Sequence, residues 1–182
     1  AVSEAATALV IVAFLFLYQH AGSFAFADIR QATPSLDPVM RDVIFVLVLI
    51  GFGAKAGIIP FQFWQTEAYP AAPSPISALL SGVISELAIY GLIRFTLDLL
   101  GPGPAWWGAV MMMIGTATAL IGVLYSLVQD NFKRLVAYSS VEHVGGIMLV
   151  GLGASLVFRG LGLLPLAAIA ALATLYHVLN HT

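Results

Sequence analysis

The chain contains no cysteine among its 182 residues. Disulfides, cysteine-ligated iron–sulfur clusters and zinc–thiolate sites are therefore excluded from this chain. Charge is also scarce: 9% of the residues are charged and the formal net charge is −2, which gives no basis for a nucleic-acid partner. Since about a quarter of the residues of a soluble domain are charged, the composition excludes an ordinary soluble domain.

Apolar residues dominate what is present. They make up 60% of the chain, and the mean hydropathy is +0.99. These values predict an all-α membrane protein, a polytopic bundle of transmembrane helices. The opening AVSEAATALV lacks methionine and the chain ends within an apolar run, so we expect residues 1–182 to be one transmembrane domain, a fragment of a longer subunit. About six spans are expected, at residues 4–20, 42–66, 76–98, 105–128, 135–158 and 161–182.

The second of these segments carries a lysine in apolar surroundings. Lys55 lies between Gly53 and Gly57, and Pro60 follows shortly after. Glycine and proline interrupt a helix, and a lysine at membrane depth costs about 2.5–3.5 kcal/mol on insertion scales. The pattern predicts a discontinuous helix with an ion or proton site at its break. The alternative is a lysine near a helix end that extends to the lipid headgroups.

Glu86 is the second charged residue expected near the middle of the membrane. A carboxylate at that depth must be neutral, paired or hydrated, which leaves a proton relay and a structural ion pair with Lys55 as interpretations.

His177 and His181 are four residues apart and share one helix face. Because imidazole can accept and donate a proton near neutral pH, a relay is the preferred interpretation for this pair. Packed, hydrogen-bonded histidines and a metal or haem site are the alternatives.

A third polar group lies where a helix is expected to start. Lys133 is at that start, and Glu142 and His143 follow further along the same segment. They are candidates for the entrance of a polar path, whereas anchoring at the membrane interface is the ordinary interpretation of Lys133.

The sequence has no GxGxxG, P-loop or GxSxG motif, so it offers no catalytic redox site and no residues for a cofactor or metal.

Three blocks of sequence resemble the signatures of the antiporter-like proton-conducting membrane subunits. They are GFGAKAGIIPFQFWQTEAYPAAPSPISALLSGVISELAIYGLIRF (51–95), DNFKRLVAYSSVEHVGGIMLVGLG (130–153) and LYHVLNHT (175–182). That family includes pumping subunits of complex I, subunits of Mrp-type antiporters, and membrane subunits of hydrogenase-4 and formate hydrogenlyase. The first two blocks are most similar to the branch of hydrogenase-4 component B and formate hydrogenlyase subunit 3.

The resemblance implies roles for several residues within an inverted-repeat fold. Lys55 matches the lysine of the family's broken helix in the central proton path, and His177 and His181 match its histidine pair. Glu86 stands where the family has a second lysine. A glutamate alternates between neutral and negative rather than between positive and neutral, so this exchange changes its coupling to neighbouring charges.

Three further residues depart from the family pattern. Gln62 stands in place of a histidine, and Gln65-Thr66 stand in place of Leu-Pro. The departures fall in the same zone as the broken helix, next to the residues expected to conduct.

The function implied by the resemblance is proton, or sodium, translocation in a redox-driven complex of a prokaryotic cytoplasmic membrane. Expected partners are the lipid bilayer, other membrane subunits and a peripheral redox arm. Iron–sulfur clusters, flavin or a nickel–iron site would lie in the partner subunits only. The alternatives are an Mrp-type cation/proton antiporter subunit and a non-pumping scaffold, in which Glu86 would be locked against Lys55.

Overall fold

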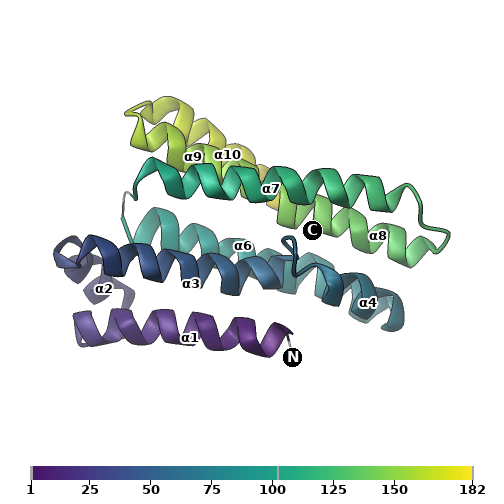
Figure 1. The fold of residues 1–182 in the computed structure, drawn as a ribbon, viewed down its shortest axis with the longest axis horizontal. Helices are drawn as coiled ribbons and strands as arrows, with labels where there is room; N and C mark the ends of the chain where they lie inside the picture. Colours follow the sequence, from purple (N-terminus) through teal and green to yellow (C-terminus); the bar gives the residue numbers. More distant parts are fainter. Residues whose placement is uncertain (1, 102, 182) are drawn as a thin grey trace.

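The computed structural model describes residues 2–101 and 103–181, and every element in these ranges is helical (Figure 1). Three elements, η2, η3 and η4, are π-helical, and η1 is a short 3-10 turn. In chain order the elements are α1 (Val2–Ala21), α2 (Phe26–Ala32), η1 (Thr33–Ser35), α3 (Pro38–Ala56), α4 (Phe63–Ala71), α5 (Ser74–Leu79), η2 (Leu80–Ser85), α6 (Glu86–Ile93), η3 (Arg94–Leu99), α7 (Ala105–Ser126), α8 (Phe132–Ser140), η4 (Val141–Met148), α9 (Leu149–Gly160) and α10 (Leu164–His181).

Several of these elements join into helices of membrane-spanning size. The run from α5 to η3 is one helix, and so is the run from α8 to α9. Within the described ranges, five helices are long and apolar enough to cross a membrane, judged by length and composition: Val2–Ala21, Ser74–Leu99, Ala105–Ser126, Phe132–Gly160 and Leu164–His181.

The segment predicted over 42–66 is divided into α3 and α4. It begins earlier than predicted, at Pro38, because the carboxylate of Asp37 accepts a hydrogen bond from the backbone N–H of Met40 (3.2 Å) and Pro38 occupies the first helical position. It also ends later, at Ala71, with Pro70 accommodated in the last turn of α4. The interruption between α3 and α4 confirms that this helix is discontinuous.

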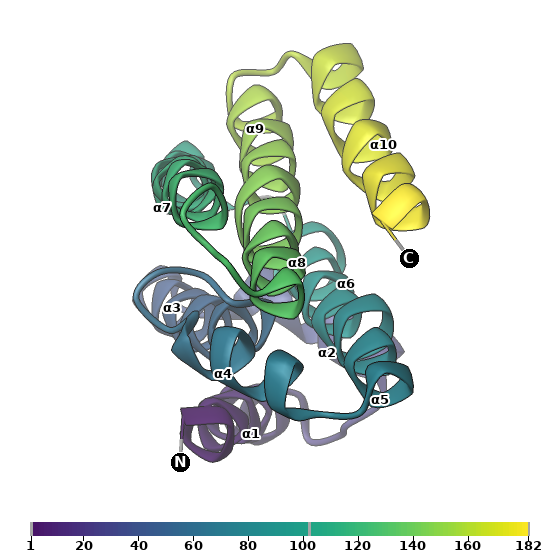
Figure 2. The same ribbon diagram turned by 90° about the vertical axis from the view of Figure 1, so that its right-hand side faces the viewer.

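The discontinuous helix packs on several neighbouring helices, while one face of α3 stays exposed. α1 contacts α3, α3 contacts α6, α7 contacts α9 and η4, and α9 contacts α10. Viewed from the end, α1 and α10 lie at opposite edges of the bundle (Figure 2). Phe45 of α3 stacks on Trp107 of α7 at 4.3 Å between ring centroids, and both side chains are fully buried. The apolar core thus joins the two halves of the chain through α3.

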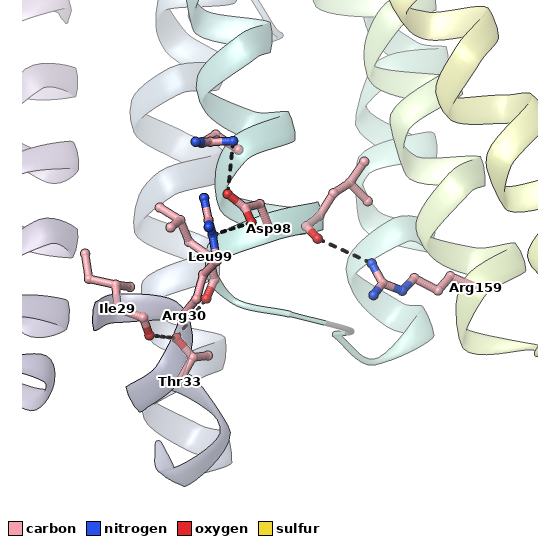
Figure 3. Close-up of polar contacts among 8 residues, drawn as sticks. Ile29, Arg30, Thr33, Asp98, Leu99 and Arg159 are labelled. Carbon is pink, nitrogen blue, oxygen red and sulfur yellow. Dashed lines mark hydrogen bonds and ion pairs between the residues drawn. The ribbon is translucent and has the colours of Figure 1, made fainter. Parts of the chain in front are cut away.

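One end of the bundle is held by a polar cluster (Figure 3). Arg30 of α2 and Arg94 of η3 both pair with the carboxylate of Asp98, at 2.6 Å and 3.1 Å. The hydroxyl of Thr33 donates to the carbonyl oxygen of Leu99 at 2.8 Å. The last carbonyls of a helix have no partner within the helix, so this contact satisfies one of them and fixes α2 to the end of η3.

Candidate functional site

The break after α3 is built from the glycines and the proline that predicted it. Gly57 has φ +85°, and its N–H bonds to the carbonyl of Gly53, which ends the helix in a left-handed turn. A Cβ on Gly53 would overlap the side chain of Ile58, so glycine lets Ile58 pack directly on the end of α3. The Ile59–Pro60 peptide that follows is cis. Lys55 therefore lies in the last turn of α3, directly before the break.

Side chains of α4 satisfy the carbonyls that the break leaves open. The indole N–H of Trp64 donates to the carbonyl of Ala54 at 2.7 Å, and the amide Nε2 of Gln65 donates to the carbonyl of Lys55 at 3.1 Å. Gln65 is fully buried. The departure from the family pattern at Gln65 thus has a structural role, because a leucine could not cap the end of α3.

The same amide links the break to the helix that carries Glu86. Nε2 of Gln65 also donates to Oγ of Ser85 at 2.9 Å, and the hydroxyl of Tyr69 lies 2.7 Å from that oxygen. Reasoning from the sequence noted Gln65 only as a departure from the family pattern, and it missed Tyr69 and Ser85. The available signal was a set of polar residues in apolar segments, since buried polar groups form hydrogen bonds.

Glu86 lies at the start of α6, directly after the π-helical η2. Its exposed fraction is 7%, and neither carboxyl oxygen has a hydrogen-bond partner among the described residues. Lys55 is half-buried, and within the described ranges no ion pair joins it to Glu86. The locked Lys55–Glu86 pair considered as an alternative is therefore not formed. A buried carboxyl group without a protein partner needs a proton, a water molecule or a cation.

The predicted histidine pair forms a cluster with a third histidine. Nδ1 of His143, in η4, lies 3.0 Å from Nε2 of His177, in α10. The rings of His143 and His181 are 5.2 Å apart between centroids. The sequence suggested His143, with Lys133 and Glu142, as a candidate path entrance, and the structure places His143 beside His177 and His181. In the part of the chain that the structure describes, no group of histidine and acidic side chains has the arrangement to hold a metal ion.

The element that carries His143 also packs on the break. A Cβ on Gly145 of η4 would lie 3.0 Å from the carbonyl carbon and oxygen of Gly57, so the two backbones approach closely. Close to this contact, the N–H of Ile59 donates to the hydroxyl of Thr118 at 3.2 Å. π-helical turns inside α-helices are frequent at functional sites, and here they lie beside Glu86 and around His143.

Lys133 and Glu142 are the other two residues predicted at an entrance. Nζ of Lys133 donates to the carbonyl of Ala72, just after α4, at 2.9 Å, and the neighbouring Arg134 pairs with Glu67. Asn131 caps α8 by accepting from the backbone N–H of Lys133 at 2.9 Å. Glu142 is half-buried in η4. Lys133 thus joins the start of α8 to the end of α4.

The chain as a whole has counterparts among known proteins. Residues 1–176 match the membrane family described as NADH:quinone oxidoreductase/Mrp antiporter. The chain belongs to this family. The resemblance stated from the sequence is thereby confirmed, and the helical bundle is that of an antiporter-like membrane subunit.

Two curated relatives of this antiporter-like chain come from Escherichia coli strain K12. Hydrogenase-4 component B is 42% identical over 182 residues, which is 99% of this chain and 27% of the relative. Formate hydrogenlyase subunit 3 is 38% identical over 183 residues, which is 100% of this chain and 29% of the relative. The chain thus spans less than a third of the length of either relative.

A solved structure shows the same fold. The antiporter-like chain is similar to a chain in the structure of the Mrp complex from Dietzia sp. DQ12-45-1b, with a TM-score of 0.74 and 24% identity. The match covers 97% of this chain and 34% of that chain.

Proposed function

We propose that this chain forms part of the proton path of a proton-translocating membrane subunit. The path residues are Lys55, Glu86, His177 and His181, with His143 joining the histidine cluster. The observation that carries the proposal is the state of Glu86, which is 7% exposed and whose two carboxyl oxygens have no hydrogen-bond partner among the described residues. A carboxyl group that the protein leaves unpaired in an apolar bundle is suited to take up and release a proton through water.

The geometry supports a chain of groups rather than a single site. Glu86 follows Ser85, which bonds to the amide of Gln65, and that amide bonds to the carbonyl of Lys55. The break at Gly57 packs on η4, which carries His143. Water molecules between these groups would complete the path, and charge changes in neighbouring subunits would shift protons along it.

We further propose that the subunit works in a redox-driven complex of a prokaryotic cytoplasmic membrane. The two Escherichia coli relatives are named as parts of a hydrogenase and of a formate hydrogenlyase. The redox centres, which are iron–sulfur clusters, flavin or a nickel–iron site, would lie in a peripheral arm and not in this chain. The second candidate is a cation/proton antiporter subunit of the Mrp type, which the shared fold favours.

The test is proton translocation by the assembled complex in inverted membrane vesicles, read with a pH-sensitive dye. In the full-length subunit we expect Glu86→Gln and Lys55→Ala to assemble normally and to lower translocation at least about tenfold, as removal of a proton-transfer group does. Glu67→Gln is the matched control, because Glu67 is exposed and pairs with Arg134 outside the path.

Three results would change the proposal. Full translocation by Glu86→Gln removes Glu86 from the path. Reduced assembly of Lys55→Ala, with normal proton flux per assembled complex, supports the scaffold alternative. Mass spectrometry of the native complex separates the other two candidates: hydrogenase or formate dehydrogenase subunits place the chain in a redox-driven pump, whereas only small membrane subunits, with sodium-dependent transport, place it in an antiporter.

A further inference from the structure

The carbonyl oxygen of Lys55 lacks the backbone donor that an unbroken helix would supply. In an α-helix it would accept from the N–H four residues later, which belongs to Ile59. That N–H donates instead to the hydroxyl of Thr118 at 3.2 Å, and the next residue, Pro60, has no N–H. The amide Nε2 of Gln65 donates to this carbonyl at 3.1 Å. Gln65 therefore replaces a backbone donor at the break.

The second N–H of the Gln65 amide is used by a different helix. It donates to Oγ of Ser85 at 2.9 Å, and Ser85 lies at the end of η2, directly before Glu86. The amide oxygen has no hydrogen-bond partner among the described residues and lies against Gly57. Since a side-chain amide has two N–H donors, one serves α3 and the other serves η2. Turning the amide over would place its oxygen against the carbonyl oxygen of Lys55, so the two donors fix its orientation.

Tyr69, one helical turn after Gln65 in α4, reaches the same serine. Its hydroxyl lies 2.7 Å from Oγ of Ser85 and 3.2 Å from the carbonyl oxygen of Leu80. The side chains of Gln65 and Ser85 are fully buried, and Tyr69 is 3% exposed. Because hydrogen bonds between buried polar groups are costly to leave unmade, α4 holds both the end of α3 and the start of α6 through these side chains.

We propose that Gln65 is a positioning residue of the proton path, whose amide fixes Lys55 and Glu86 relative to each other. It does so by holding the backbone carbonyl of Lys55 and the residue directly before Glu86. The inference rests on the proposed function and adds to it a residue that does not itself carry the transferred proton. Because two interacting titratable groups change each other's titration, a fixed separation sets the pH range over which the pair exchanges protons. The leucine of the family pattern has no side-chain donor and cannot form this link.

The test compares variants that break the link from either end, made in the full-length subunit within its membrane complex. Gln65→Met keeps an unbranched side chain but removes both N–H donors. Ser85→Ala removes the acceptor and leaves the bond to the carbonyl of Lys55 in place. Thr96→Val is the matched control, because Thr96 is fully buried in the same long helix and its hydroxyl donates within that helix, to the carbonyl of Leu92 at 2.7 Å.

Proton flux per assembled complex is measured in inverted vesicles as a function of pH. We expect Gln65→Met and Ser85→Ala each to lower flux by about 3–10-fold and to shift the midpoint of its pH profile by about 0.5–1 pH unit, the size of one net hydrogen bond. Both shifts should have the same direction, since both variants break the same link. The double variant should shift the midpoint no further than Gln65→Met alone. Thr96→Val should leave flux and midpoint unchanged.

The outcomes separate the positioning role from the proposed function. Lower flux with an unshifted pH profile in Gln65→Met and Ser85→Ala overturns the positioning role and gives Gln65 a structural role only. Opposite shifts in the two single variants, or additive shifts in the double variant, overturn the link through Ser85. If Gln65→Met does not assemble, Ser85→Ala decides against the Thr96→Val control.

Glu86→Gln shows which of the two claims has failed. Normal flux in Gln65→Met and Ser85→Ala, with Glu86→Gln inactive, overturns the positioning role and leaves the proposed function standing. Normal translocation by Glu86→Gln overturns the proposed function and the positioning role with it.

Discussion

Gly57 is a position where the structure predicts a large effect of a single methyl group. Its φ of +85° is unfavourable for any residue with a Cβ, and a Cβ there would overlap the amide oxygen of Gln65. The left-handed conformation costs about 1–2 kcal/mol. Moving Gln65 weakens its bonds to the carbonyl of Lys55 and to Ser85, at about 0.5–1.5 kcal/mol for each bond. We therefore expect Gly57→Ala to lower the free energy of unfolding by about 2–5 kcal/mol.

Gly162 provides the matched control for this prediction. It has φ +76°, close to that of Gly57, but a Cβ there would have nothing within 4 Å. Gly162→Ala should therefore lose only the backbone part, about 1–2 kcal/mol. The measurement is unfolding of the purified full-length subunit by increasing SDS in detergent micelles, followed by tryptophan fluorescence.

A double-mutant cycle isolates the contact with Gln65. In a Gln65→Ala background the overlap is gone, so Gly57→Ala should cost only as much as Gly162→Ala does. Equal losses for Gly57→Ala and Gly162→Ala in the unmodified subunit would refute the reasoning, since they would show that Gln65 does not hold the break together.

Three further predictions follow from single contacts. Asp98→Asn removes ion pairs at the partly exposed end of the bundle and should lower the free energy of unfolding by about 1 kcal/mol or less; a loss above about 3 kcal/mol in the SDS titration would contradict this. Trp107→Phe keeps an aromatic ring but leaves the carboxylate of Asp42 without its 2.7 Å hydrogen bond, so about 1–3 kcal/mol should be lost in the same titration. His143→Asn breaks the 3.0 Å contact with His177 and should lower proton flux about tenfold with normal assembly; flux at the unmodified level would place His143 outside the path.

The local sequence pattern was enough to predict where the long helices lie. Apolar runs of membrane length predicted the five long helices, because a segment of about 20 apolar residues has few other stable states in a bilayer. The break after α3 was predicted by Gly57 and Pro60, since their backbone preferences act within a few residues of themselves. The exact ends of α3 and α4 were less certain, because capping by Asp37 and tolerance of Pro70 depend on local geometry.

The partners of the titratable residues were decided only by tertiary structure. The sequence left a Lys55–Glu86 pair open, and the packing of α3 on α6 leaves Glu86 without a protein partner among the described residues. It gave no partner for His143, and the approach of η4 to α10 brings this residue to His177.

The sequence by itself therefore determined that this is a helical membrane protein with a lysine at a broken helix. The length and hydropathy of each segment, and the glycine and proline residues that break a helix, are local properties of the sequence. Tertiary structure alone decided that Gln65 caps the break. It also decided that Ser77 and Ser81 line a cavity together with Lys133 and His181. These contacts join residues far apart in the chain, and they depend on how each helix is rotated and on the π-helical turns, neither of which the apolar pattern of a membrane helix specifies.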